Sequence, residues 1–191
     1  DMRVLVIDDH IETPEGLISI PPREIQVGKV AAELAGLITQ GNGRILVSCG
    51  RKDSKIHEGR LESFCNYIKE NKPELIIELV TGYTRNMNHR GELYKNACEA
   101  LDKYSDICLI YALTSHDNRA FVEALEKHGK NKKVPIIGTD LNEETLEFLK
   151  QKRMSAVIDQ NPYDKGYMAF KIMVDCLIKN MSVPDVIPCR I

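Results

Sequence analysis

Short apolar segments alternate with amphipathic ones along nearly the whole chain, and this alternation constrains the fold more than any other feature. Apolar runs typical of buried strands lie at residues 2–7, 44–49, 75–80, 107–113, 134–138 and 154–159. Segments with apolar residues at helical spacing lie at residues 25–38, 57–70, 91–104, 117–128, 142–152 and 166–179. Strands that are apolar throughout, separated by helices, are typical of a parallel sheet covered on both faces. We therefore predict an α/β fold with a doubly wound parallel sheet.

Two segments fall outside this alternation. Residues 8–22 contain Pro14, Pro21 and Pro22 and are predicted to form a loop or crossover, and residues 183–191 are predicted to form a short extended tail. The chain enters its first predicted strand at once, so no signal peptide is visible. The absence of an initiator methionine at position 1 indicates a piece of a longer protein.

Composition and charge exclude several classes of protein. Of the 191 residues, 43% are hydrophobic and 28% are charged, which is typical of a globular chain rather than a disordered one. The net charge of −2 provides no basic excess for holding nucleic acid. No apolar run reaches the roughly 20 residues of a membrane helix, so we expect no membrane partner.

The cysteines indicate a compartment rather than a site. There are six of them: Cys49, Cys65, Cys98, Cys108, Cys176 and Cys189. None forms a Cys-x-x-Cys pair or has a histidine at zinc-like spacing, so we expect no metal site. Small buried thiols in a reducing compartment are the favoured interpretation, which places the protein in the cytoplasm. A set of disulfides and a catalytic thiol remain the alternatives.

Polar side chains follow several of the predicted strands, at the edge where parallel sheets bind ligands. They include Asp8 and Asp9, residues 115–117, 139–140 and 159–160, with Lys52 and Arg60 as nearby cations. Carboxylate, amide and guanidinium groups together match the donors and acceptors of a neutral, hydroxyl-rich ligand such as a sugar. The alternative for each residue is a helix cap or a solvated loop position, and for Asp117 the capping role is favoured.

Signatures of catalysis are missing from the sequence. The chain has no Gly-x-Ser-x-Gly elbow, no His-Glu-x-x-His helix and no glycine-rich phosphate loop. We therefore predict a binding protein without enzymatic activity, with an α/β sugar kinase or hydrolase as the alternative class. Residues 2–10 look like the first strand of a response-regulator receiver domain. That likeness is not sustained, because a proline-containing loop follows and the run at 75–80 ends in Thr81-Gly82 rather than an aspartate.

Five stretches, in order along the chain, resemble the effector-binding core of the LacI/GalR family of transcriptional regulators, a branch of the type I periplasmic-binding-protein fold. They are Val-Gly-Lys-Val-Ala-Ala-Glu-Leu at 27–34, Arg-Leu-Glu-Ser-Phe at 60–64, Val-Pro-Ile-Ile-Gly-Thr-Asp at 134–140, Asp-Gln-Asn-Pro-Tyr-Asp-Lys-Gly-Tyr-Met-Ala at 159–169, and Ile-Pro-Cys-Arg at 187–190. Each stretch alone is loose, but their joint order is specific.

The resemblance implies roles for individual residues. Arg60 matches the arginine that grips sugar hydroxyls or an effector carboxylate, and Asp140 matches the aspartate that accepts sugar hydroxyls. Gln160 matches the glutamine at a hinge crossover that reaches the ligand. His116 stands where the family has an asparagine ligand, and Ser54 lies near a secondary polar contact. We expect the polar tips of Arg60, Asp140 and Gln160 to be accessible and to converge on one ligand.

The resemblance also implies a domain organisation and a function. Residues 1–43 and 154–191 are expected to form the remnant of an N-terminal lobe with hinge crossovers, and residues 44–153 the C-terminal lobe. The implied protein is a homodimeric regulator that senses a small-molecule effector, expected to be a carbohydrate, and contacts DNA only through a headpiece missing from this chain. No cofactor is implied. The alternative is a sugar-binding protein of a transporter or sensor kinase with the same fold.

Overall fold

The computed structural model of the chain describes residues 4–9, 17–51, 53–82, 89–130, 133–179, 181–182 and 185–188. The chain divides into two compact units. The smaller unit comprises Asp1–Arg23 and Asp159–Ile191, and the larger unit comprises Glu24–Ile158.

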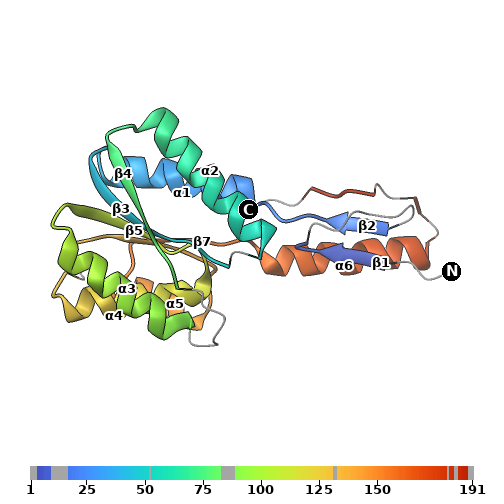
Figure 1. Ribbon diagram of the computed structural model, residues 1–191. Helices are drawn as coiled ribbons and strands as arrows, with labels where there is room; N and C mark the ends of the chain where they lie inside the picture. The colour runs from blue at the N-terminus through green and yellow to red at the C-terminus, as the bar shows by residue number, and fades with distance from the viewer. Residues whose placement is uncertain are drawn as a thin grey trace. The chain divides into compact units, whose positions relative to one another are not determined.

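A five-stranded parallel sheet forms the centre of the larger unit (Figure 1). Its strands are β3 (Gly43–Ser48), β4 (Leu75–Val80), β5 (Ile107–Tyr111), β6 (Ile136–Thr139) and β7 (Ala156–Ile158). Their order is β4-β3-β5-β6-β7, so the chain adds β4 on one side of β3 and the three later strands on the other. The predicted doubly wound parallel sheet is confirmed, and its order reverses between β3 and β5.

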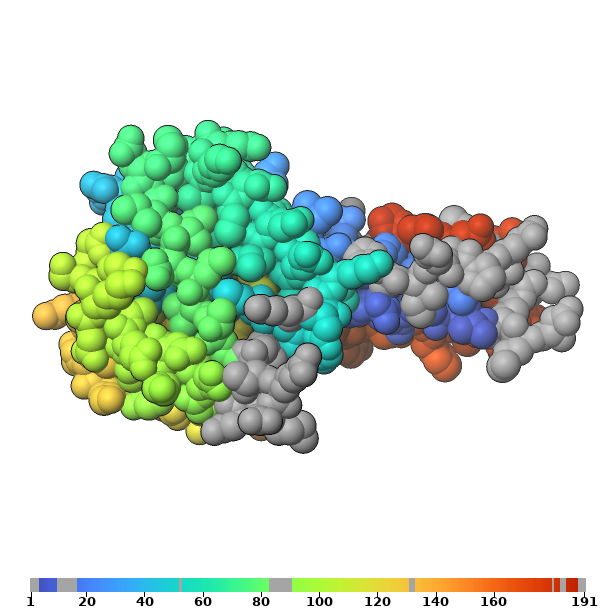
Figure 2. Space-filling view, viewed as in Figure 1, coloured from blue at the N-terminus to red at the C-terminus, as the bar shows by residue number. Residues whose placement is uncertain are grey.

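Helices cover both faces of this sheet. Helices α1 (Glu24–Ile38) and α2 (Lys55–Asn71) lie on one face, and α3 (His89–Lys103), α4 (Ser115–Lys127) and α5 (Glu143–Lys150) lie on the other (Figure 1). In the space-filling view, α2 and α3 can be followed by their colours on the face of the larger unit turned to the viewer (Figure 2). None of the helices in the described part of the chain is long and apolar enough to cross a membrane.

The main core of the larger unit lies between the sheet and the helices α3 and α4. Leu46 of β3 and Ile110 of β5 are fully buried there. They belong to one apolar cluster with Leu93 of α3 and with Phe121 and Leu125 of α4, which are also fully buried. These residues occupy positions that the strand and helix periodicities predicted to be internal.

A glycine brings the other two helices into close contact. A Cβ atom at Gly28 of α1 would clash with the carbonyl oxygen of Arg60 on α2. One helical turn further along α1, Ala31 and Ala32 are fully buried. The hydroxyl of Ser63 on α2 donates a hydrogen bond of 2.6 Å to the carbonyl oxygen of Ile25. The small residues of this Gly-x-x-Ala-Ala pattern therefore let α1 approach α2 closely, and this contact fixes the distance of Arg60 from the sheet.

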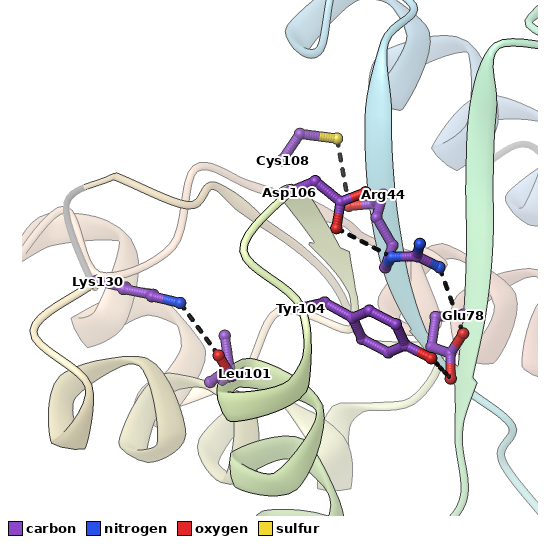
Figure 3. Close-up of polar contacts among 7 residues, drawn as sticks. All are labelled: Arg44, Glu78, Leu101, Tyr104, Asp106, Cys108 and Lys130. Atoms are coloured by element: carbon purple, nitrogen blue, oxygen red, sulfur yellow. Dashed lines mark hydrogen bonds and ion pairs between the residues drawn. The ribbon is translucent and has the colours of Figure 1, made fainter.

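A polar cluster joins strands β3, β4 and β5 near their amino ends (Figure 3). The Arg44 guanidinium donates to Asp106 at 3.1 Å and lies 3.5 Å from a carboxylate oxygen of Glu78. The hydroxyl of Tyr104 donates to the same Glu78 carboxylate at 3.0 Å, and its ring lies 4.0 Å below the Arg44 guanidinium. The Cys108 thiol donates to the carbonyl oxygen of Arg44 at 3.3 Å. These contacts set the register of the sheet at the end opposite its carboxyl edge.

The smaller unit is built on two parallel strands and one helix. Strands β1 (Val4–Ile7) and β2 (Leu17–Ile20) pair over their full length, and α6 (Pro162–Leu177) packs against them. Ile20 and Ala169 are buried in the small apolar cluster between them.

Two expectations are wrong in this smaller unit. Strand β2 lies inside residues 8–22, which were predicted to be a loop, because the run Leu-Ile-Ser-Ile is only four residues long and ends at Pro21. Helix α6 begins at Pro162 rather than at 166, since Asn161 serves as its N-cap with a left-handed φ of +54°. In the tail, Val186 forms a parallel bridge to Ser19, while residues 183–184 and 189–191 lie outside the described residues.

The division into units differs from the expected boundaries at two segments, 24–43 and 154–158, both of which were expected to belong with the N-terminal remnant but lie in the larger unit. Helix α1 lies there because it packs against α2, closely at Gly28, and β7 lies there because it pairs with β6. The identification of the units as N-terminal and C-terminal lobes stays a prediction.

Candidate functional site

A buried hydrogen-bond network joins the carboxyl ends of β3 and β5, where the strand order reverses. The Ser48 hydroxyl, at the end of β3, donates to Asp117 Oδ2 at 2.7 Å and accepts from the Leu113 N–H at 2.8 Å. The same Asp117 oxygen accepts from the Thr114 N–H at 3.1 Å, at the start of α4. Asp117 is fully buried. It braces the loop after β5 and, as the third residue of α4, accepts from the backbone of the N-cap residue Thr114. The capping role predicted for Asp117 is confirmed, but the predicted start of the helix at 117 is wrong, because the helix begins at Ser115.

Arg60 lies on α2 with its side chain directed to this network. Its Nη1 donates a hydrogen bond of 2.6 Å to the carbonyl oxygen of Leu113. The residue is only 3% exposed. The expectation that Arg60 is openly accessible is therefore wrong, because one guanidinium nitrogen is committed to the backbone of the loop after β5. The structure instead places its positive charge at the carboxyl ends of β3 and β5, where the strand order of the sheet reverses.

His57 stands in the first turn of α2 and was missed by the sequence analysis. Its Nδ1 accepts a hydrogen bond of 2.9 Å from the Arg51 N–H. Burial lowers the pKa of His57, and the positive charges of Arg60 and Arg51 lower it further, while the carboxylates of Asp117 and Asp140 oppose them. A neutral imidazole that accepts at Nδ1 carries its proton on Nε2, so His57 is a hydrogen-bond donor at that atom.

Asp140 follows β6 directly in a left-handed conformation, with a φ of +65°. Its N–H donates at 2.9 Å to the carbonyl oxygen of Ile158, at the end of β7. The residue is half-buried, and its negative charge opposes the lowering of the His57 pKa. Asp140 follows β6, which pairs with β5, and Arg60 contacts the loop after β5 through Leu113, so both predicted ligand residues lie at the carboxyl ends of adjacent strands.

An aromatic pair adjoins these groups. Tyr111, at the end of β5, is fully buried and stacks on Phe64 of α2 with ring centroids 4.7 Å apart. Burial raises the pKa of Tyr111 to about 12, against the opposing effect of the Arg60 charge. The phenol is therefore neutral at physiological pH. The stack ties α2 to the sheet one turn beyond Arg60 and helps to position it.

The other two predicted residues of the larger unit have different surroundings. Ser54 is the N-cap of α2, and its hydroxyl accepts a hydrogen bond of 3.4 Å from the His57 N–H. Its observed role is to hold the turn that carries His57. His116 is exposed in the first turn of α4, next to the buried Asp117.

In the smaller unit, polar residues lie at the end of β1 and at the start of α6. Gln160, the last predicted ligand residue, is half-buried just before the Asn161 cap. Asp8 follows β1 with a left-handed φ of +56°, and its carboxylate accepts a bond of 2.5 Å from the Lys165 ammonium. The Asp8 side chain is 44% exposed, whereas that of Lys165 is 1% exposed. Asp8 was noted after a strand but not assigned as a ligand residue, and its strand-end position was the available signal.

Two surface hollows in the described part of the chain lie away from these strand-end groups. One of about 550 Å³ runs between α1 and α2, lined by residues that include Ile25, Lys29, Ser63 and Tyr67. A smaller one of about 200 Å³ lies between β4 and α3. Neither is lined by Arg60, His57 or Asp140. The strand-end groups, rather than these hollows, carry the chemistry suited to a polar ligand.

The chain is similar to several proteins that are named for a sugar or solved with one bound. The D-allose-binding periplasmic protein of Escherichia coli (strain K12) is 30% identical over 88 residues, which make up 46% of this chain and 28% of that protein. The glucose-galactose binding protein GanP of Geobacillus stearothermophilus superposes with a TM-score of 0.83 at 21% identity, covering 99% of this chain and 66% of that one. An ABC transporter solute-binding protein of Agrobacterium vitis, solved with bound D-fucose, gives 0.81 at 20% identity, covering 98% and 64%.

These matches show the fold and how much of the length of each relative the chain spans. The chain spans about two thirds of the length of the two solved proteins, and the segment shared with the D-allose-binding protein is a smaller part of it. A family model described as the periplasmic binding protein domain matches residues 2–180, almost the whole chain. The chain belongs to the periplasmic binding protein domain family.

Proposed function

We propose that this chain binds a monosaccharide, as the sugar-binding component of a transport or sensing system and without catalysing a reaction. The observation that carries this proposal is the group of Arg60, His57 and Asp140 at the carboxyl ends of the sheet. It combines a cation, a neutral imidazole donor and a carboxylate, which together match the alternating donors and acceptors of sugar hydroxyls. The relatives named for allose, glucose and galactose, and the one solved with fucose, support the same ligand class.

Each group has a defined role in this proposal. The Asp140 carboxylate accepts hydrogen bonds from sugar hydroxyls, and His57 donates from Nε2. The Arg60 charge favours hydroxyl oxygens as acceptors and holds the loop after β5 in place through Leu113. In the smaller unit, the half-exposed Asp8 carboxylate and Gln160 are polar groups that suit the same ligand class. His116 and Ser54 act at the margin of the site, Ser54 through its cap on α2.

A second candidate is the effector domain of a LacI-type regulator. It is favoured by the order of the five family-like stretches and by the six cysteines, which suit a reducing cytoplasm. This candidate includes the predicted homodimer and contact with DNA through a separate headpiece. The relatives are sugar-binding proteins, one of them named as periplasmic, and they favour transport or sensing outside the cytoplasm. The sequence of the intact gene product distinguishes the two, by a DNA-binding headpiece or a secretion signal.

The ligand class is tested by titrating the purified chain with D-allose, D-glucose, D-galactose, D-fucose and D-arabinose in a calorimeter. We expect at least one of these sugars to bind. Asp140→Ala should then weaken it by at least tenfold, since a hydrogen bond to a charged group contributes about 1.5–3 kcal/mol and a factor of ten corresponds to about 1.4 kcal/mol.

The matched control is Glu143→Ala, which removes an exposed carboxylate three residues further along, in the first turn of α5. We expect it to leave the affinity unchanged. Equal affinities for the wild type and Asp140→Ala would remove Asp140 from the site. Failure of every sugar to bind would contradict the proposed function for this chain.

A further inference from the structure

The Lys165 ammonium is a charge buried in an unfavourable place. Lys165 lies in the first turn of α6 and its side chain is 1% exposed. The amino end of a helix carries a partial positive charge that disfavours a lysine there. A buried cation is also costly unless a counter-charge and hydrogen bonds compensate it. A charged lysine at this position therefore requires a counter-charge that forms a hydrogen bond with it.

That partner is Asp8, at the carboxyl end of β1. The Lys165 Nζ donates to Asp8 Oδ1 at 2.5 Å, over a separation of 157 residues in the sequence. Asp8 is fixed from its backbone as well, since its N–H donates at 3.0 Å to the carbonyl oxygen of Ile20 at the end of β2. The nearest acidic residue on the helix itself, Asp164, is engaged by Asn161, whose Nδ2 donates to it at 2.7 Å. The Lys165 charge is thus directed at Asp8.

The two partners differ in exposure in a way that points to function. Lys165 is enclosed, but the Asp8 side chain keeps 44% of its surface exposed at a strand end. A carboxylate that gives one oxygen to a buried ammonium can present its other oxygen to a ligand. Because the pair is neutral overall, it suits an uncharged hydroxyl better than a cationic group.

We propose that Lys165 is a positioning and specificity-determining residue for a sugar contact made by the smaller unit: it orients Asp8 and neutralises it, so that Asp8 selects neutral sugars over amino sugars. This inference rests on the proposed function, because it takes Asp8 to be a ligand contact. A purely structural ion pair would affect folding of the smaller unit without altering the choice between neutral and cationic ligands.

The test compares the affinities of one neutral sugar, the tightest of the five titrated, with its 2-amino-2-deoxy counterpart. The chains are the wild type, Lys165→Met and Asp8→Asn, with Lys171→Met as the control for loss of an exposed lysine on the same helix. In Lys165→Met, the uncompensated Asp8 carboxylate should move the ratio of affinities at least tenfold toward the amino sugar. In Asp8→Asn, the uncompensated Lys165 should move it at least tenfold in the opposite direction. Lys171→Met should leave it unchanged.

The outcomes separate this inference from the proposed function. An unchanged ratio in Lys165→Met, with a neutral sugar still bound, overturns the role of Lys165 and leaves the sugar-binding proposal standing. If Lys165→Met has no cooperative unfolding transition, Asp8→Asn decides, because an unchanged ratio there overturns the same role. Absence of sugar binding by the wild-type chain overturns both.

Discussion

His57 is the residue whose chemistry depends most on its neighbours. Its ring is held by the Arg51 N–H, and burial together with the charges of Arg60 and Arg51 lowers its pKa. The lowered pKa could not be predicted from the sequence. Arg60 follows His57 one turn later on the same helix, but the burial of the ring and the charges of Asp117 and Asp140 arise only in the fold. By contrast, the position of Asp140 at a strand end could be predicted, because it directly follows a strand of a parallel sheet. The position of Arg60 near these strand ends could also be predicted, but its burial could not.

The lowered pKa of His57 gives a testable dependence of stability on pH. A histidine whose pKa is lower in the folded protein binds its proton more readily in the unfolded chain. The stabilisation is therefore complete above the ordinary value of 6.5 and is lost as the pH falls from there through the lowered value. We predict that the free energy of unfolding decreases below pH 6.5 and that His57→Gln reduces this decrease.

Urea unfolding at a series of pH values measures this effect. His116→Gln, which replaces an exposed histidine, is the control and should retain the wild-type slope. A slope in His57→Gln equal to that of the wild type would show that His57 does not titrate differently on folding.

At the scale of elements, the close packing of α1 on α2 depends on one glycine. Gly28→Ala places a methyl group against the Arg60 carbonyl oxygen, which is backbone and cannot move aside alone. We predict a loss of about 1–3 kcal/mol in the free energy of unfolding, typical of overpacking, together with weaker sugar binding because Arg60 shifts. Gly166→Ala on α6 is the matched control, since its added methyl group meets no described atom within 4 Å outside its chain neighbours and the adjoining backbone of its own helix. Equal stability of the two variants, measured by thermal unfolding, would contradict this packing argument.

The polar cluster at the amino ends of β3, β4 and β5 should stabilise the sheet without contributing to binding (Figure 3). Arg44→Met removes its ion pairs with Asp106 and Glu78, which are partly exposed and therefore screened. We predict a loss of about 1 kcal/mol in stability and no change in sugar affinity. Lys95→Met, at an exposed pair on α3, should change neither quantity. A tenfold change in the affinity of Arg44→Met would show that the two ends of the sheet are coupled.

Most strands and helices could be predicted from periodicity, and the wrong predictions have local causes. The long apolar runs of the larger unit identified all five of its strands. Strand β2 escaped because four residues beside a proline carry little periodic signal. The start of α6 escaped because its N-cap, Asn161, adopts a left-handed conformation that sequence patterns rarely indicate.

At the scale of the whole molecule, the chain spans about two thirds of the solved sugar-binding proteins it resembles. Its smaller unit has only two strands, and apolar side chains of α6, among them Tyr163, Tyr167 and Phe170, are exposed. Exposed apolar surface of this kind is usually covered by further chain or by a partner. The predicted homodimer stays a prediction.

A crystal structure of the chain with its tightest monosaccharide tests the central claim most directly. We predict that sugar hydroxyls lie within hydrogen-bond distance of the Asp140 carboxylate and of His57 Nε2, at the carboxyl ends of the strands. A sugar bound instead in the hollow between α1 and α2, with no contact to Asp140 or His57, would contradict it.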